Sequence, residues 1–153
     1  MADMKIAFVG YRGCGKSNII NRLTKLEFCP FYERTKSRQE SYMNTSSGRY
    51  VLSEICIDVP HFDLPDLSGI HFVFLCIDGD NTISIRQSGF IRSVLLERNI
   101  PFRIIVTKSD VSTKLNVNDD MILTSSKTGT GIDKILESFP MCHIGSFRTK
   151  KYV

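Results

Sequence analysis

A glycine-rich stretch at residues 10–17 is the feature that most restricts the fold of this chain. Its letters, GYRGCGKS, fit the pattern G-x-x-x-x-G-K-[ST]. Residues 6–9 before it are apolar and β-prone, and the apolar residues behind it recur at helical spacing, at positions 19, 20, 23 and 26. A strand, a glycine loop and a helix in this order predict a phosphate-binding loop, or P-loop.

The chemistry of this loop follows from its glycines and its last two residues. Glycines at positions 10, 13 and 15 let the backbone curl tightly and turn its N–H groups inward, where the start of the helix adds partial positive charge. Lys16 would reach the β- and γ-phosphates of a nucleotide, and the Ser17 hydroxyl would ligate Mg²⁺. The predicted phosphate cradle comprises Gly13, Cys14, Gly15, Lys16, Ser17 and Asn18.

The composition is that of one globular domain. The 153 residues are 42% hydrophobic and 24% charged, and no apolar run approaches the roughly 20 residues of a membrane span. The net charge of +4 is concentrated only in the tail, so we expect a domain over 1–141 and a basic tail over 142–153. With no signal peptide or lipidation motif, we expect no stable membrane anchor, and no nucleic-acid partner. The five cysteines form no C-x-x-C pair, which predicts a reducing, cytoplasmic location.

Apolar runs and helical patterns alternate along the rest of the chain. We expect a hairpin from 39–45 and 49–58, strands over 70–77, 102–106 and 121–123, and helices over 83–99 and 132–139. Near-continuous apolar strands are typical of a parallel sheet covered on both faces. The alternation predicts an α/β fold: a doubly wound, mostly parallel six-stranded sheet with its ligand at the carboxyl ends of the strands.

Residues 107–110, which read TKSD, indicate the nucleotide base. They lie just past a predicted strand, where an α/β sheet places its ligand. The Asp110 carboxylate can accept two hydrogen bonds from N1–H and the 2-amino group of guanine. Adenine has no such donor pair and would leave the carboxylate unpaired. The stem of Lys108 can lie along the base plane.

A second segment, residues 125–129, follows the last predicted strand and reads SSKTG. Ser125, Ser126 and Lys127 of this segment are candidate guanine contacts: backbone N–H groups of the segment can meet guanine O6, while Lys127 covers the ring. Together with residues 107–110, this segment predicts a guanine site next to the phosphate cradle.

With these residues the chain resembles the Ras-like small GTPases, from Lys5 to about Phe139. That family has, in order, a P-loop, a magnesium-binding Thr in a mobile loop, D-x-x-G, [NT]-K-x-D and S-A-K. Thr107 replaces the commoner Asn and is a variant familiar from Rho-type members. The resemblance implies GTP or GDP as ligand with Mg²⁺ as cofactor. It also implies that Phe28 flanks the guanine, with a plain core contact as the alternative.

The resemblance further implies a set of magnesium ligands. Ser17 would bind the metal directly, and Asp58 would hold it through a water. The mobile-loop hydroxyl is Thr35 by its distance from the P-loop. Counting back from residues 40–42 points to Ser37 instead, so spacing leaves both open.

The chain departs from the family pattern where GTP is hydrolysed. Residues 58–62 read DVPHF, so His61 stands at the glycine of D-x-x-G and Phe62 at the glutamine that orients the attacking water. A phenyl ring cannot hydrogen-bond a water. His61 is a candidate for that role in a reshaped loop, with an exposed loop histidine as the alternative. Arg12 replaces a P-loop glycine of Ras, and it would crowd the γ-phosphate, point into solvent or act as an arginine finger.

Two connections are too short for the helices that a compact Ras-like domain carries. Eleven residues separate Asp58 from Ile70, and ten separate Asp110 from Met121. Both missing helices belong to one sheet face, which residues 83–99 would then mainly cover. An open apolar face costs roughly 25 cal/mol per Å². Rearranged loops, a homodimer or another partner must therefore close it.

These observations predict a minimal guanine-nucleotide switch that hydrolyses GTP slowly. Loops 29–38 and 59–69 would order around the γ-phosphate, relax without it and contact effector or regulatory proteins. The alternative is a hydrolysis-deficient pseudo-GTPase that holds nucleotide as an interaction module. A small-molecule kinase with the same P-loop is a third interpretation.

Overall fold

The structure is a computed structural model of the chain and describes residues 3–24, 38–45, 48–57, 66–109, 118–143 and 146–148. For residues 38, 39, 141–143 and 146–148 it describes the backbone alone. Within these ranges the chain forms a central sheet, three helices and a small second sheet.

The central sheet has six strands in the order β2-β3-β1-β4-β5-β6. All neighbours pair in parallel except β2, which runs antiparallel to β3. The mostly parallel six-stranded sheet predicted from the sequence is therefore confirmed. The strands are β1 (Met4–Tyr11), β2 (Arg38–Thr45), β3 (Gly48–Ile57), β4 (Phe72–Asp78), β5 (Phe102–Thr107) and β6 (Met121–Leu123).

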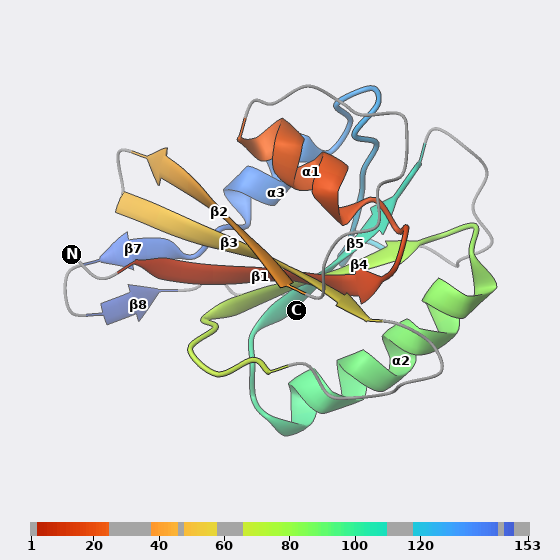
Figure 1. Cartoon of the computed structure of the whole chain (residues 1–153), viewed down its shortest axis with the longest axis horizontal. Helices are drawn as coiled ribbons and strands as arrows, with labels where there is room; N and C mark the ends of the chain where they lie inside the picture. Colours follow the sequence, from red (N-terminus) through yellow and green to blue (C-terminus); the bar gives the residue numbers. More distant parts are fainter. Residues whose placement is uncertain are drawn as a thin grey trace.

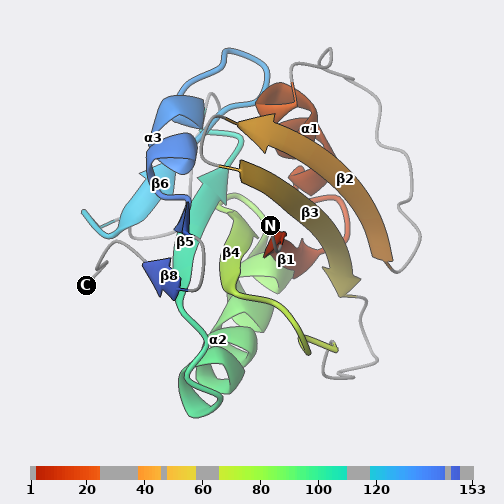
Figure 2. The same cartoon turned by 90° about the vertical axis from the view of Figure 1, so that its left-hand side faces the viewer.

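Helices cover both faces of this sheet. α1 (Lys16–Leu23) and α3 (Ile132–Glu137) lie side by side on one face, and α2 (Thr82–Glu97) lies on the other (Figures 1 and 2). α2 begins directly after Asn81, because the Asn81 side chain accepts hydrogen bonds from the N–H groups of Ile83 and Ser84. Among the described residues, no helix combines the length and apolar character that crossing a membrane requires.

β1 is apolar along most of its length because it lies in the middle of the sheet and is covered on both faces. Ile6 and Phe8 point to the α1 face, while Ala7 and Val9 point to the α2 face, and all four are buried. On the α1 face, Phe8 stacks on Phe74 with ring centroids 5.1 Å apart. These buried side chains anchor the strand whose carboxyl end carries the glycine loop.

The α2 face is closed within one chain. Most of its apolar strand residues, including Ile55 and Ile57 of β3, are buried in one cluster with Ile91 and Leu95 of α2 and Leu67 of the preceding segment. Phe102 and Ile104 of β5 are partly buried against this cluster. The sequence left open whether loops, a second copy or another partner covers this face. The burial favours rearranged segments of the chain itself.

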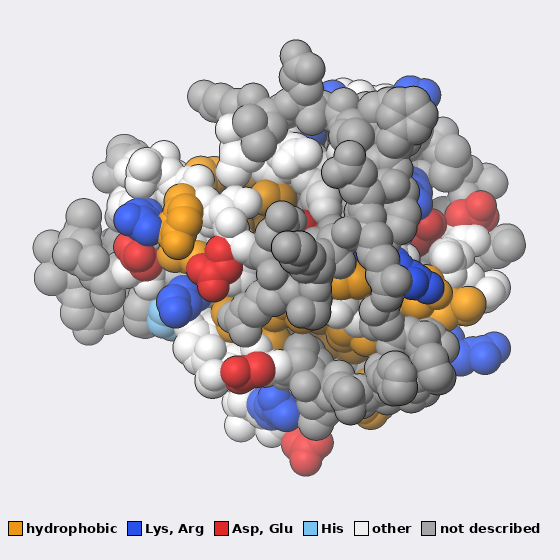
Figure 3. Space-filling model, viewed as in Figure 1, with side chains coloured by type: hydrophobic (Ala, Val, Ile, Leu, Met, Phe, Trp, Pro, Cys, Tyr) orange, Lys and Arg blue, Asp and Glu red, His pale blue; other side chains and the backbone are white. Residues whose placement is uncertain are grey.

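The short connections contain no helix in their described parts, which are residues 66–71 and 118–120. Residues 58–65 and 110–117 lie outside the described ranges. Within the stretch expected as a basic tail, β7 (Met141–His143) and β8 (Ser146–Arg148) pair antiparallel as a separate two-stranded sheet. Figure 3 shows acidic and basic side chains interspersed over the described part of the face in view.

Candidate functional site

The loop between β1 and α1 has the conformation that its glycines permit. Gly15 caps α1 with φ at 98°, in the left-handed region that side chains rarely adopt. At Gly10 the restriction is space, because a Cβ there would lie 2.5 Å from the carbonyl oxygen of Cys76. The loop is therefore packed against the end of β4 and turns sharply into the helix.

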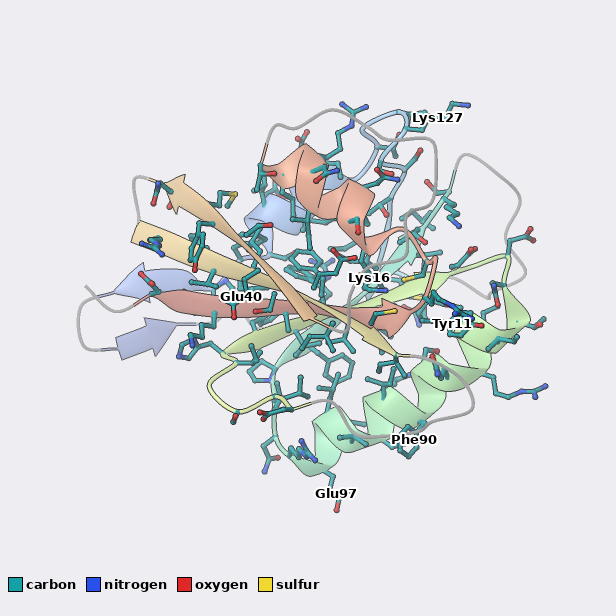
Figure 4. All side chains as sticks on the ribbon, viewed as in Figure 1. Tyr11, Lys16, Glu40, Phe90, Glu97 and Lys127 are labelled. Atoms are coloured by element: carbon teal, nitrogen blue, oxygen red, sulfur yellow. The ribbon has the colours of Figure 1, made fainter. Side chains whose placement is uncertain are left out.

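Lys16 extends back along this loop from the first turn of α1 (Figure 4). Its ammonium donates to the carbonyl oxygens of Gly10 at 3.1 Å and Tyr11 at 3.0 Å, and the residue is 3% exposed. Burial alone lowers the pKa of Lys16, but the acidic groups around it outweigh burial and raise the pKa above its ordinary value. Those groups are Cys14, Cys56, Cys76 and Glu54.

The charge of Lys16 is thus secure at neutral pH. Burial raises the pKa of the Cys76 thiol well above its usual value, so that group is neutral there. The carboxyl group of the set belongs to Glu54. A buried ammonium in a glycine loop at the start of a helix suits a polyphosphate ligand.

Ser17 contacts a residue that the sequence interpretation missed. Its Oγ–H donates to Oε1 of Glu54 at 2.5 Å, and Glu54 is 5% exposed. The parallel register of β1 and β3, which pairs Phe8 with Glu54, places the carboxylate beneath the start of α1. The signal in the sequence that could have indicated this contact was a single glutamate within the largely apolar strand β3.

The donor chemistry around Ser17 fits Mg²⁺. Hydroxyl and carboxylate oxygens are the hard ligands that this ion prefers, and it usually takes only one or two protein ligands beside phosphates. Within the described ranges, no group of three or more His, Cys, Asp or Glu side chains is arranged to hold a metal. A magnesium ion here would therefore depend on the nucleotide for part of its coordination.

The segment that follows β5 is tied directly to the glycine loop. The Thr107 hydroxyl donates to the Cys14 carbonyl oxygen and lies 3.3 Å from that of Ile77. Lys108 has a positive φ of 59°. Its ammonium reaches the Gly13 carbonyl oxygen at 2.8 Å. Residues about 95 positions apart in the chain are thus joined by hydrogen bonds, as joint binding of a base and phosphates requires.

Lys108 has a second, acidic partner. Its ammonium lies 3.0 Å from Oδ2 of Asp78, a largely buried carboxylate at the end of β4. An open hollow of about 460 Å³ lies beside this pair and continues along the start of α2. The hollow is lined by Asp78, Asp80, Asn81, Thr82, Ile83 and Lys108.

The loop at residues 125–130 is closed by its own backbone. The N–H of Ser125 donates to the Thr130 carbonyl oxygen at 3.0 Å, and the N–H of Gly129 donates to the Ser125 carbonyl oxygen at 2.7 Å. Ser125 is buried, Ser126 is half-buried and Lys127 is exposed. The loop is therefore a compact turn whose lysine reaches solvent (Figure 4).

Arg22 of α1 braces this loop and was not expected from the sequence. Its Nε donates to the Ser126 carbonyl oxygen at 2.6 Å, and its Nη2 donates to the Lys127 carbonyl oxygen at 2.9 Å. The helix that begins at the phosphate loop thereby also positions the predicted guanine loop.

The structure brings the predicted residues of the glycine loop together with Lys108 and the 125–127 loop. Arg12 and Asn18 are half-buried, and the Arg12 N–H donates to the Ile57 carbonyl oxygen at 3.3 Å. The remaining predicted site residues lie outside the described ranges. They are Phe28, Thr35, Ser37, Asp58, His61, Phe62 and Asp110.

A P-loop at the carboxyl end of a parallel strand, braced by a TKxD segment and a second loop, defines a P-loop nucleotide-binding protein. A family model described as 50S ribosome-binding GTPase matches residues 5–136. The chain belongs to this family of P-loop GTPases, whose domain binds and hydrolyses GTP. Comparison with individual curated proteins gives no match.

Proposed function

We propose that this chain is a minimal, Ras-like guanine-nucleotide switch that binds GTP or GDP with Mg²⁺ and hydrolyses GTP slowly when alone. The observation that supports it best is the contact of Lys108 with the Gly13 carbonyl oxygen at 2.8 Å. It joins the segment expected to select guanine to the loop expected to hold phosphates.

In this proposal the nucleotide spans the carboxyl end of the sheet. Lys16 and the loop N–H groups hold the phosphates, while Lys108, Asp110 and the 125–127 loop hold guanine. Mg²⁺ would be held by Ser17, by Thr35 or Ser37, and by Asp58 through a water. When bound, the metal neutralises phosphate charge during transfer to water.

Slow hydrolysis is inferred from residue types near the γ-phosphate. Phe62 cannot orient water, so His61 would have to do so. Arg12 is the second departure from the family pattern, because it replaces a P-loop glycine near the γ-phosphate position. A partner protein that supplies the missing catalytic group in trans would accelerate GTP hydrolysis, as arginine fingers do for related GTPases.

Loops 29–38 and 59–69 are proposed as the surfaces for effector or regulatory proteins. They border the γ-phosphate position in the expected fold, so their order would depend on which nucleotide is bound. A cytoplasmic location is proposed with them. A homodimer through the α2 face is not favoured, because most of the described strand residues on that face are already buried.

The nucleotide assignment is tested by displacement of a fluorescent GDP analogue from the purified full-length chain. GDP and GTP should compete, whereas ADP should not. Asp110→Asn should shift preference toward xanthine nucleotides, because it exchanges an acceptor pair for an amide. Lys16→Met should weaken binding, and Lys134→Met, a lysine of α3, serves as the charge-matched control. Preference for ADP over GDP would favour the kinase interpretation.

Phe62 also supports a second candidate, a pseudo-GTPase that keeps its nucleotide. Single-turnover hydrolysis of bound GTP separates the two. Phosphate release over minutes to hours supports the switch. Intact GTP after many hours, still bound, supports the pseudo-GTPase.

A further inference from the structure

Glu54 on β3 is a buried carboxylate that the proposed function does not use. The residue is 5% exposed and its Oε1 accepts the Ser17 hydroxyl proton at 2.5 Å. A charged side chain is almost never buried unless it is paired or serves a metal. Its place in the middle of an apolar strand therefore needs a reason.

Fold stability does not supply that reason. β3 places Leu52 and Glu54 on the same face, and Leu52 packs in the apolar cluster beneath α1. An apolar residue of similar size at position 54 would continue the same cluster. Apolar replacements of buried ionic groups are often neutral or stabilising. The carboxylate is thus explained better by what it does for its neighbours than by packing.

The neighbour it serves is the Ser17 hydroxyl. A hydroxyl has one proton to donate and two lone pairs to offer. Donating the proton to Glu54 orients the lone pairs away from the strand and makes the oxygen a better ligand. Groups that hold a metal ligand in this way typically change metal affinity by tenfold to a hundredfold.

Lys16 is a further group near Glu54 that could use it as a counter-ion. The ammonium of Lys16, however, donates to Gly10, Tyr11 and the Sγ of Cys14, at 3.0–3.5 Å. Its hydrogen bonds are directed along the glycine loop and not to Glu54. The short contact of the carboxylate is with Ser17.

We propose that Glu54 is a positioning residue for nucleotide-bound Mg²⁺: it accepts the proton of the Ser17 hydroxyl and so directs the lone pairs of that oxygen toward the metal. The inference rests on the proposed function, because it concerns the same ion. Glu54 belongs to a central strand, so its contribution is the same whether the 29–38 and 59–69 loops are ordered or not. GDP and GTP complexes should therefore both retain Mg²⁺ strongly.

The test is release of a fluorescent GDP analogue from the full-length chain over a range of free Mg²⁺ concentrations. The variant is Glu54→Gln, which keeps the shape and removes the charge. The control is Glu40→Gln, an exposed glutamate of β2 that pairs with Ser53, the neighbour of Glu54. Mn²⁺ bound to each GDP complex, measured by electron paramagnetic resonance, is the second readout.

We expect Glu54→Gln to raise the Mg²⁺ concentration for half-maximal retention by about tenfold to a hundredfold. Its Mn²⁺ affinity should fall by a similar factor, while release in EDTA stays unchanged. In a Ser17→Ala background the Glu54 change should add little, because Glu54 acts through Ser17. Glu40→Gln should match the wild type throughout.

Two results overturn the inference. One is an unchanged Mg²⁺ requirement in Glu54→Gln while the wild type responds to Mg²⁺. The other is an equal change in release with and without Mg²⁺, which would indicate a charge effect on the phosphates. If Glu54→Gln does not fold, the same titration on Glu54→Asp decides, since the shorter side chain draws back from Ser17. A wild type that retains no guanine nucleotide overturns the proposed function, and this inference with it.

Discussion

Arg22 and Ser126, 104 residues apart in the chain, are joined by a hydrogen bond of 2.6 Å from Nε to the carbonyl oxygen. The guanidinium thus couples the helix that starts at the phosphate loop to the loop expected to meet guanine O6. We therefore expect a change at the phosphate-loop helix to affect the 125–130 loop, and the reverse. The contact is also accessible to mutation without touching the expected ligand positions.

Replacing Arg22 by Ala should loosen the 125–130 loop. The substitution removes two charge-assisted hydrogen bonds. The partly buried bond to Ser126 is worth roughly 1.5–3 kcal/mol, and the exposed bond to Lys127 is worth less because solvent screens it. We expect release of a fluorescent GDP analogue to accelerate by about tenfold, with a smaller loss of thermal stability. Stopped-flow displacement measures the rate.

Arg92→Ala is the matched control, because Arg92 is an exposed arginine of α2 on the opposite sheet face. It should leave the release rate unchanged. Equal release rates in Arg22→Ala and Arg92→Ala would show that the brace does not matter for nucleotide retention.

The Thr107 hydroxyl should be required for a stable junction between β5 and the glycine loop. Thr107→Val keeps the shape of the buried side chain but removes the donor to the Cys14 carbonyl oxygen. A carbonyl left without its partner costs about 1–3 kcal/mol. Urea denaturation should show this loss for Thr107→Val and a much smaller one for Thr107→Ser, which keeps the hydroxyl. A loss as large in the serine variant would assign the effect to the methyl group instead.

Two glycine-to-alanine substitutions should have opposite effects on stability. Gly10→Ala forces a Cβ against the Cys76 carbonyl oxygen, and the backbone must shift, so we expect a loss of several kcal/mol or failure to fold. Gly89→Ala lies inside α2, where a new Cβ meets nothing within 4 Å. It should stabilise the chain by roughly 0.5–1 kcal/mol through helix propensity.

Thermal denaturation of both variants against the wild type checks this pair. Because the same chemical change is made twice, the comparison isolates the surroundings of each glycine. A destabilised Gly89→Ala would contradict the open space on that side of α2.

Acidification should destabilise the chain through His71. Its Nδ1 accepts the Lys5 backbone N–H at 2.9 Å, and burial, with a smaller effect of the Lys5 charge, lowers the pKa of His71 below its usual value near 6.5. The folded state thus binds this proton more weakly than the unfolded state. The contribution is present above pH 6.5 and is lost as pH falls through the lowered pKa.

Denaturation curves at pH 7.5 and pH 5 measure the effect. His71→Asn offers an amide oxygen to the same N–H and does not titrate, so its stability should fall less between the two pH values. An identical fall in both proteins would show that other groups carry the acid sensitivity.

The fold was predictable because its signals are local. β4 is a buried apolar run, and the apolar residues of α1 and α2 recur at helical spacing, so composition and period indicated each element. The phosphate loop was predictable for the same reason, since its glycines and lysine are contiguous. The β7–β8 hairpin was missed because a short basic segment carries no periodic signal.

The parts of the site that escaped prediction depend on pairing across the sheet. Glu54 lies near Ser17 only because β1 and β3 pair in one register, and Arg22 meets the 125–130 loop only because α1 and α3 share a face. A single sequence contains no record of either relationship. An acidic residue within an apolar strand could have been marked as unusual, but its partner could not have been named.

The fixed conformation of the Lys16 side chain affects the entropy cost of binding a ligand. A lysine side chain loses about 1.5–2 kcal/mol of conformational entropy when it is fixed in one geometry. Here folding has already fixed it, through the carbonyl groups of Gly10 and Tyr11. A phosphate bound here would replace one of the three acceptors of the ammonium, but it would meet a side chain that is already ordered, so that more of the interaction energy would remain as affinity.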